Sequence, residues 1–263
     1  MPRKAVKIED AKVTLPDGKM HFLSSGKGSP VLLLHPMGSS AFAWSKVLQS
    51  LAEEHTIYAL DAMGQGDSDK PERDYTIAEF ANAVVNFMKV KGINKASLIG
   101  NSIGAVFATQ IAASNPDIVD KLILVGCPCR ETERERKENL ANMKNRYDEK
   151  NMPFPRTMET LKQSYTHVSP ELLKKVNEDL RKVGVWSYKT SIALNNYDIV
   201  SALGKIKVKT LIVFGEKDML RSKENAIKNY IKDSELVLIP DAGHVPQMDN
   251  PEAFLKVVQP FLK

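Results

Sequence analysis

The sequence predicts an α/β protein built on a doubly wound, mostly parallel eight-stranded sheet, with a helical cap inserted between strands 6 and 7. Short apolar runs suited to buried strands alternate with helical segments over most of the chain. A charged interval without strands interrupts this alternation between about residues 130 and 205. We therefore expect a core domain formed by residues 1–129 and 206–263, and a cap formed by residues 130–205.

The first half of the chain begins with a hairpin. Residues 11–15 and 19–24 flank Pro16-Asp17-Gly18, a turn signal between two strands. The apolar run at 31–34 is typical of a buried parallel strand. Thr76 and Glu79 form a capping box that marks a helix start. The remaining expected elements are helices over 42–51 and 103–113 and strands over 55–60, 95–99 and 121–125.

The second half contains the cap and the end of the sheet. Between 130 and 205 the chain has 15 Lys and Arg against 11 Asp and Glu, so this interval holds most of the net charge of +5. Strands resume at 210–214 and 235–239, with a helix over 224–231 between them. Asn250 and Pro251 suit the N-cap and first position of a final helix.

Composition excludes several classes of protein. The 263 residues are 43% hydrophobic, which allows a sizeable core. The excess of five positive charges forms no basic stripe, so we expect no nucleic-acid partner. Apolar runs are far shorter than the roughly 18 residues of a membrane span. Cys127 and Cys129 are one residue apart, so a disulfide between them would enclose no useful loop. Two cysteines are also too few ligands for a zinc site, and we therefore expect reduced thiols. With the charged N-terminus, this predicts a cytoplasmic protein.

The strongest chemical signal is the segment Gly100-Asn101-Ser102-Ile103-Gly104. It matches G-x-S-x-G and lies between an expected strand and an expected helix, which is the context that the motif requires. The sharp turn demands small residues two positions before and after the serine, and both are glycine. The sequence therefore predicts that Ser102 is a nucleophile.

A serine hydroxyl needs a general base, and His244 is the favoured one of five histidines. It follows the last strand, and loops at the carboxyl ends of strands form the site in open α/β sheets. We expect His21 to be a solvated strand residue and His35 to form a structural hydrogen bond near the site. His55 and His167 have no motif around them.

The base in turn needs a carboxylate that fixes its tautomer. Asp218 follows the strand at 210–214 and completes the chain order Ser, Asp, His. Asp241, in the loop of the histidine itself, and Glu216 are the alternatives.

Together these segments resemble the α/β-hydrolase superfamily over nearly the whole chain. The resemblance also includes His35-Pro36-Met37-Gly38 and the stretch from Asp61 to Pro71, which looks like that of haloalkane dehalogenases and epoxide hydrolases. Those enzymes have an aspartate nucleophile where this chain has Ser102. Asn101 is similar to the G-N-S-x-G elbow of meta-cleavage-product hydrolases, which cut carbon–carbon bonds, whereas Val245 stands where they usually have tryptophan.

The resemblance implies further site residues. The backbone N–H groups of Met37 and Ile103 would form the oxyanion hole, although this chain has Pro36 where the family usually has glycine. The interval 130–205 lies where the family inserts a cap that covers the serine. Candidate substrate-binding residues are Asn101 in the core and Phe154, Met158, Trp186 and Tyr188 in the cap. Any one of the four cap residues could instead only pack the cap on the core.

These features predict a serine hydrolase that cleaves carboxylic esters of small to medium size through an acyl-enzyme. We expect no metal, no organic cofactor and no membrane or nucleic-acid partner, and either a monomer or a homodimer. One alternative is a carbon–carbon bond hydrolase that uses the same three residues. Another is a slow-turnover ligand sensor on a hydrolase scaffold.

Overall fold

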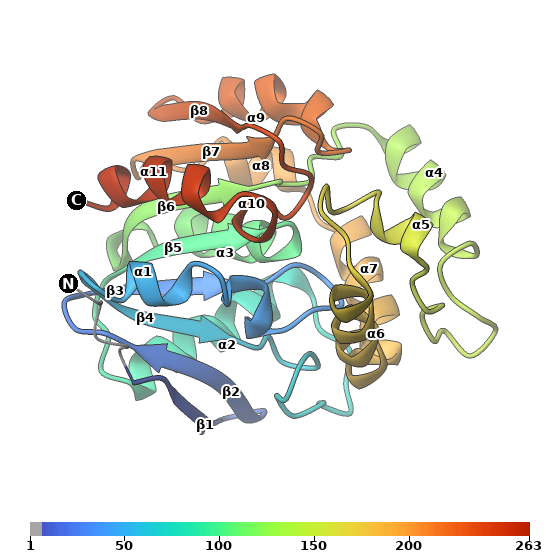
Figure 1. Cartoon of the computed structure of the whole chain (residues 1–263), viewed down its shortest axis with the longest axis horizontal. Coiled ribbons are helices and arrows are strands. Elements are labelled where there is room, and N and C mark those ends of the chain that lie inside the picture. The colour runs from blue at the N-terminus through green and yellow to red at the C-terminus, as the bar shows by residue number, and fades with distance from the viewer. Residues whose placement is uncertain (1–6) are drawn as a thin grey trace.

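A computed structural model describes residues 7–263, which form one eight-stranded sheet with strand order β1-β2-β4-β3-β5-β6-β7-β8 (Figure 1). β1 pairs antiparallel with β2, and β2 pairs antiparallel with β4. All other neighbouring strands pair in parallel. The predicted fold class is confirmed. The strands are β1 (Glu9–Leu15), β2 (Gly18–Ser25), β3 (Ser29–Leu34), β4 (His55–Leu60), β5 (Ala96–Asn101), β6 (Val119–Val125), β7 (Thr210–Gly215) and β8 (Ser234–Ile239).

Different helices cover the two faces of the sheet. On β3, Leu32 and Leu34 pack in an apolar cluster with side chains of α2, α3, α8 and α9. Val31 and Leu33 alternate with them and pack on the opposite face with η1, α1 and α11. Because both faces are buried, the strand is apolar at every one of these positions. These helices are η1 (Ala41–Trp44), α1 (Leu48–Leu51), α2 (Ile77–Val90), α3 (Ile103–Ser114), α8 (Ile199–Leu203), α9 (Glu224–Tyr230) and α11 (Pro251–Leu262).

The helix expected over 42–51 is interrupted. The chain forms the 3-10 turn η1, leaves the helical region at Val47, where φ is −120°, and then begins α1. Trp44, Val47 and Leu48 are all buried against the sheet. Burial of these three side chains takes precedence over the continuity of the helix, so the prediction of one helix was wrong.

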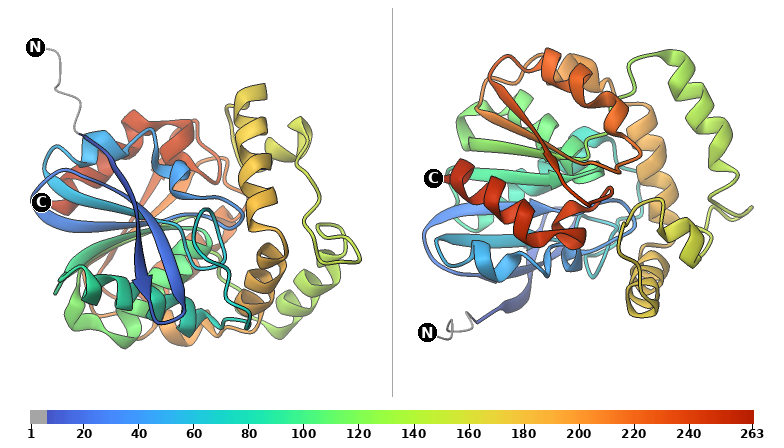
Figure 2. Two further views of the ribbon diagram at one scale, coloured as in Figure 1. Left: turned by 90° about the horizontal axis from the view of Figure 1, so that it is seen from below. Right: turned by 45° about the horizontal axis from the view of Figure 1, so that its top comes forward.

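The cap is a helical insertion between β6 and β7, as predicted, and lies beside the carboxyl ends of the parallel strands (Figure 2). Gly184 has φ 55°, a conformation that suits glycine, and there the chain turns from α6 directly into α7. The exact division at residues 130 and 205 stays a prediction. The cap helices are α4 (Glu133–Met143), α5 (Met158–Leu161), α6 (Pro170–Val183) and α7 (Val185–Asn195).

Both predicted helix starts are confirmed. The capping box at the start of α2 is complete, because Thr76 and Glu79 each accept a backbone N–H of the other. Asn250 caps α11 through the N–H of Ala253. Among the helices of residues 7–263, none combines the length and apolar character that crossing a membrane demands.

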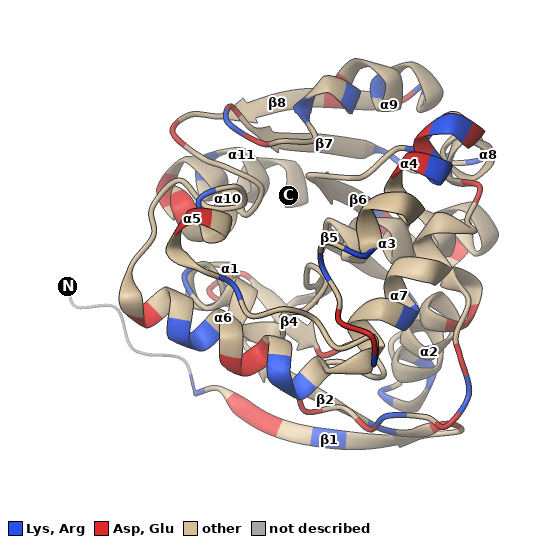
Figure 3. Cartoon of the chain, turned by 90° about the vertical axis from the view of Figure 1, so that its right-hand side faces the viewer, with Lys and Arg blue, Asp and Glu red and all other residues tan. Residues whose placement is uncertain are grey.

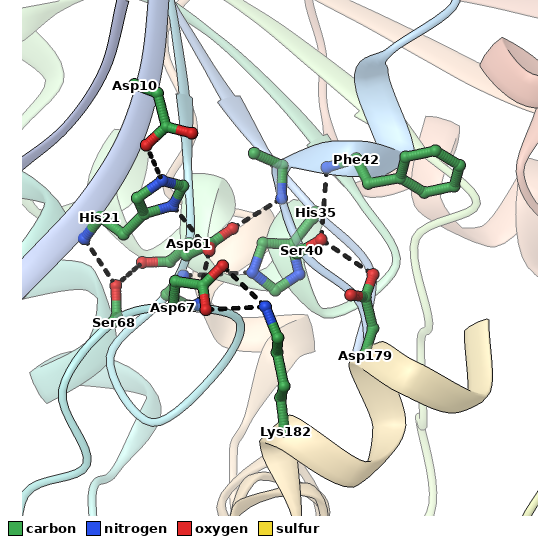
Figure 4. Close-up of polar contacts among 12 residues, drawn as sticks. Asp10, His21, His35, Ser40, Phe42, Asp61, Asp67, Ser68, Asp179 and Lys182 are labelled. Atoms are coloured by element: carbon green, nitrogen blue, oxygen red, sulfur yellow. Dashed lines mark hydrogen bonds and ion pairs between the residues drawn. The ribbon is translucent and has the colours of Figure 1, made fainter. Parts of the chain in front are cut away.

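His21 of β2 is buried and lies in an ion-pair network, which corrects the expectation of a solvated residue (Figure 4). Its Nδ1 lies 2.8 Å from Oδ2 of Asp61, and its Nε2 lies 3.0 Å from Oδ1 of Asp10. The hydrogen bond with Asp61 raises the pKa of His21, although burial opposes this effect. Burial also opposes ionisation of Asp61, but His21 and the N–H groups of Asp67 and Ala41 hold the pKa of Asp61 below its ordinary value.

This network predicts a pH-dependent contribution of His21 to stability. Its raised folded-state pKa means that the contribution is full below about pH 6.5 and declines as pH rises through that pKa. We expect His21→Gln to lower the free energy of unfolding by about 1–3 kcal/mol near pH 5.5 and by less at pH 9. Urea denaturation at both pH values measures the difference. Equal losses at the two values would contradict a charged His21.

Candidate active site

Ser102 lies in the sharp turn between β5 and α3, so the predicted order of strand, turn and helix is confirmed. Its φ of 56° and ψ of −116° are strained for a residue with a side chain. Its N–H donates to the carbonyl of Val125 at 2.8 Å, which ties the turn to the end of β6. The hydroxyl thus stands beside the N-terminus of α3, where the helix dipole favours negative charge.

The two glycines of the motif are required by close backbone packing. A Cβ atom on Gly100 would lie 2.2 Å from the carbonyl oxygen of Gly104. A Cβ atom on Gly104 would lie 2.2 Å from the carbonyl oxygen of Leu34, at the end of β3. Any larger side chain would push α3 away from β5 and β3. Glycine at these two positions therefore allows the turn to form.

Asp218 and His244 come together at the ends of β7 and β8. Nδ1 of His244 lies 3.0 Å from both carboxylate oxygens of Asp218. The carboxylate has no exposed surface and also accepts the N–H of Leu220 at 2.8 Å. The contact leaves Nε2 of His244 as the ring nitrogen available to another group. This is the arrangement expected of a general base and the carboxylate that orients it.

The side chain of Asn101 connects the serine turn to the loop that carries His244. Its Nδ2 donates to the carbonyl of Val125 at 3.1 Å and to that of His244 at 3.0 Å. Its Oδ1 accepts from Gln247 at 3.1 Å, and the side chain has no exposed surface. A buried amide with its bonds satisfied cannot reach a substrate. The expectation that Asn101 binds substrate is thus replaced by a positioning role.

The loop after β3 keeps an ordered shape despite Pro36. Nδ1 of His35 donates to the carbonyl of Pro36 at 2.8 Å, and Nε2 accepts the N–H of Ala62 at 3.1 Å. This is the structural hydrogen bonding predicted for His35. Gly38 donates its N–H to Oε1 of Gln65 at 3.0 Å. Within residues 7–263 the N–H of Met37 has no hydrogen-bond partner, and its part in an oxyanion hole stays a prediction.

The cap helix α6 holds the same loop from the other side (Figure 4). Ser40 donates its hydroxyl to Oδ2 of Asp179 at 2.8 Å, and Lys175 donates to Oδ1 at 2.7 Å. Asp179 is buried, so these bonds compensate its desolvation. Lys182, also on α6, pairs with Asp67 at 2.7 Å. The position of the cap is therefore coupled to the shape of the loop that carries Met37.

Sequence reasoning missed a group of hydroxyls on the inner side of the cap. The Tyr147 hydroxyl lies 2.8 Å from Oγ of Ser191 and 3.1 Å from Oγ of Ser187. Ser191 in turn donates to Sδ of Met37 at 3.1 Å. The spacing of the two serines by four positions places them on one face of α7 and could have indicated a common partner.

The candidate pocket residues differ in their surroundings. Trp186 is buried in the core, where its ring packs edge-on against Tyr75 and Phe80, so it holds the cap on the core. Tyr188 packs edge-on against Tyr147. Phe154 is 48% exposed. Met158 begins α5 and is partly buried. A role in substrate binding stays a prediction for Phe154, Met158 and Tyr188.

The two alternative carboxylates lie elsewhere. Asp241 is exposed and pairs with Lys217 at 2.6 Å and with His167 at 2.9 Å. The hydrogen bond from Lys217 keeps the pKa of Asp241 below its ordinary value. Glu216 is exposed, and its carboxylate accepts the N–H of Asp241 at 3.4 Å. Of the three carboxylates, Asp218 is the one that contacts His244.

One group of side chains has the composition of a metal site. The ligand atoms of His21, Asp61 and Asp67 lie within 4.8 Å of one another. However, Oδ2 of Asp61 already accepts from His21 and from the N–H of Asp67. Both oxygens of Asp67 accept from Lys182. Protein donors thus satisfy these ligand atoms, and the group is best described as an ion-pair network.

The chain belongs to the α/β-hydrolase family, because the sequence profile of the alpha/beta hydrolase fold matches residues 29–251. It is 25% identical to the 2-hydroxy-6-oxo-6-(2'-aminophenyl)hexa-2,4-dienoic acid hydrolase of Metapseudomonas resinovorans, covering 92% of this chain and 86% of that one. It is 28% identical to human epoxide hydrolase 4, over 98% and 78% of the two chains. A 104-residue stretch is 38% identical to an uncharacterised protein of Mycobacterium tuberculosis, covering 40% of this chain but 30% of that relative.

Solved structures of other α/β-hydrolase-fold proteins superpose on nearly the whole chain. A membrane phospholipase A, described as a bacterial virulence factor, superposes with a TM-score of 0.85 at 25% identity, covering 97% of this chain and 86% of that one. A thermophilic esterase from Thermogutta terrifontis superposes with a TM-score of 0.82 at 24% identity, over 97% and 98% of the two chains. At that identity the likeness to the esterase establishes the fold alone.

The strain at Ser102 predicts that a glycine variant at this position is more stable than an alanine variant, the reverse of the order in a helix interior. Glycine adopts a φ of 56° without the cost of about 1–3 kcal/mol that a side chain incurs, although its freedom in the unfolded chain offsets part of this gain. We expect Ser102→Gly to be more stable than Ser102→Ala by about 1 kcal/mol in urea denaturation. At Gln110, in the interior of α3, the glycine variant should be less stable than the alanine variant. The same order at both positions would contradict strain at Ser102.

Proposed function

We propose that this protein is a serine hydrolase that cleaves carboxylic esters of small to medium size. The observation that carries the proposal is the contact of His244 with both carboxylate oxygens of Asp218. This contact lies at the carboxyl ends of the strands, as does the strained turn of Ser102. Family membership supports hydrolytic chemistry without naming a substrate. Ser102, Asp218 and His244 follow one another in the chain order of the family.

The first half of the reaction acylates the serine. Nε2 of His244 removes the proton of Ser102, and Oγ attacks the ester carbonyl. Asp218 holds the imidazolium in place through Nδ1. The N–H groups of Met37 and Ile103 stabilise the negative oxygen of the tetrahedral intermediate. As the carbonyl re-forms, the C–O bond to the alcohol breaks, and His244 gives its proton to the leaving oxygen.

The second half releases the acid. His244 removes a proton from water, and the hydroxyl adds to the acyl carbon of the ester formed with Ser102. Collapse of the second tetrahedral intermediate returns the proton to Oγ of Ser102 and releases the carboxylic acid. These steps need no metal or organic cofactor, because serine supplies the nucleophile and backbone N–H groups supply the electrostatic stabilisation.

A second candidate is hydrolysis of a carbon–carbon bond by the same residues. The observation in its favour is the full-length similarity to two hydrolases of 2-hydroxy-6-oxo-hexadienoates, at 25% and 27% identity. Val245 does not match the tryptophan usual in such enzymes, so ester hydrolysis is the preferred function. The cytoplasmic location and the monomeric or homodimeric state stay predictions; Cys127 and Cys129 are both free thiols.

The proposal predicts that Ser102 alone reacts with a fluorophosphonate probe. Wild type, Ser102→Ala, His244→Ala and Asp218→Asn are labelled and then assayed on p-nitrophenyl esters of graded chain length. We expect Ser102→Ala to lose labelling and about 10⁶ in kcat, as loss of a catalytic nucleophile does elsewhere. Ser201→Ala removes an exposed serine of α8 and serves as the matched control.

The remaining outcomes distinguish the alternative functions from the proposed one. Labelling at Ser102 with turnover of a 2-hydroxy-6-oxo-hexadienoate but not of esters would establish the carbon–carbon hydrolase. Labelling at Ser102 without turnover of either substrate would indicate a ligand sensor. Absence of labelling in folded wild-type protein would contradict the serine mechanism. A thermal melt of every variant separates loss of chemistry from loss of folding.

A further inference from the structure

A cavity of about 540 Å³ lies where the cap meets the core, between α7 and the start of α2. Residues 74–78 form one wall, and side chains of α7 and of the two residues that follow it form the other. Asp74 and Asn196 belong to the lining and are exposed, so the cavity opens to solvent. Small-molecule sites in proteins have volumes of roughly 300–1,000 Å³, and this cavity therefore has the size of such a site.

Helix α7 separates the cavity from the loop that carries Met37. Lys189 and Ile192 line the cavity and share one face of the helix, because they are three positions apart. Ser187 and Ser191 lie on the opposite face of α7, and Ser191 donates to Sδ of Met37 at 3.1 Å. The cavity is therefore distinct from the side of α7 that faces the candidate oxyanion hole.

The body of the cavity is apolar, and its aromatic walls are fixed. The Tyr75 hydroxyl donates to Oδ2 of Asp17, and the Tyr197 hydroxyl donates to Oε1 of Gln110, each at 2.7 Å. Because protein acceptors already occupy both hydroxyls, the two residues present their rings as walls. The aliphatic part of the lining consists of Ile77, Ala78, Ile192 and Ala193. A ligand of this cavity therefore gains most from an apolar body.

The polar side chains on the α7 side of the cavity can all donate hydrogen bonds. Lys189 is the one charged side chain of α7, whereas α4 and α6 carry many charges of both signs (Figure 3). Its Nζ lies 5.1 Å from the centroid of the Trp186 ring, which holds the ammonium against the helix. Within residues 7–263 the side chains of Tyr188 and Asn196 have no hydrogen-bond partner. These donors suit a ligand acceptor with a negative charge.

The protein partner of Lys189 is easily replaced. Nζ of Lys189 lies 2.8 Å from Oδ1 of Asp74, but the Asp74 side chain is 79% exposed, against 24% for Lys189. An ion pair with so exposed a partner contributes little to stability, because water solvates the carboxylate almost as well. A ligand carboxylate in the cavity can therefore take the place of Asp74, which then returns to solvent.

We propose that this cavity is a second ligand site, which binds carboxylic acids that have an apolar body. The carboxylate pairs with Lys189 and accepts a hydrogen bond from Asn196, while the body packs against the rings of Tyr75 and Tyr197. The site lies outside the residues of the proposed ester hydrolysis and does not depend on that activity. Because the acid contacts both α7 and the start of α2, its binding also stabilises the cap on the core.

Calorimetry with three small molecules tests the proposal. The first, 4-phenylbutanoate, has an apolar body and a carboxylate. The second, 4-phenylbutanamide, has the same body without the charge, and the third, acetate, has the charge without the body. We expect one molecule of 4-phenylbutanoate to bind per chain, about 10-fold more tightly than either of the others. None of the three is an ester, so the result is independent of turnover.

Variants of the cavity locate the bound acid. Lys189→Gln should reduce the affinity for 4-phenylbutanoate to that for the amide, and Lys189→Arg should keep most of the difference, because it keeps the charge. Ala193→Leu fills part of the cavity and should weaken the binding of both compounds. Lys174→Gln removes an exposed lysine of α6 and is the matched control. A thermal melt of each variant checks that it is folded.

Three results would overturn the proposal. Equal affinities for 4-phenylbutanoate and 4-phenylbutanamide would contradict a carboxylate site. An affinity for 4-phenylbutanoate that neither Lys189→Gln nor Ala193→Leu changes would place the acid elsewhere, for example at Ser102. Absence of binding at millimolar concentrations in folded wild-type protein would exclude the site altogether.

Discussion

The strained backbone at Ser102 is the constraint on which the rest of the site depends. A residue with φ 56° directly after a buried strand turns the chain sharply enough to start α3 at the next position. The turn closes only because Gly100 and Gly104 allow backbone atoms to approach where a Cβ atom would be 2.2 Å away. The same contact brings the start of α3 against the end of β3. A single turn therefore places the partly exposed Ser102 at the start of α3, and it packs that start against the end of β3, from which the loop of Met37 leads.

That loop is held by buried carboxylates from two directions. Asp61, at the end of β4, accepts the N–H of Ala41 at 2.6 Å. Asp179, on the cap, accepts the hydroxyl of Ser40 at 2.8 Å. A buried carboxylate that loses its donors is costly, so both contacts resist displacement. The cap is therefore part of the framework of the site as well as its cover.

Local patterns predicted the parts of the fold that depend on local geometry. The glycine spacing around Ser102 reports a backbone requirement directly, and the alternation of strands and helices follows from burial. Asp218 was preferred to Asp241 because it directly follows the strand at 210–214, whereas Asp241 suits an Asx-type turn in the loop of the histidine itself. The contact with His244 agrees with that preference. The carboxylate of Asp241 instead pairs with Lys217.

Features set by distant contacts could not be predicted from the sequence. Ser40 and Asp179 lie 139 positions apart, and neither has a local signal for the other. Asn101 was expected to face a substrate, because the sequence of a strand end does not tell which way a side chain points. In the fold it faces inward, onto the carbonyls of Val125 and His244. The break in the helix over 42–51 likewise depends on burial of Val47 against the sheet.

The central claim is that the turn of Ser102 and the loop of Met37 together form one site that stabilises an oxyanion. The most direct measurement is a crystal structure of the protein after reaction with a fluorophosphonate. The account predicts phosphorus bonded to Oγ of Ser102 and a phosphonyl oxygen about 2.7–3.1 Å from the backbone nitrogens of Met37 and Ile103. A phosphonyl oxygen that points to solvent, or that contacts neither nitrogen, would contradict it.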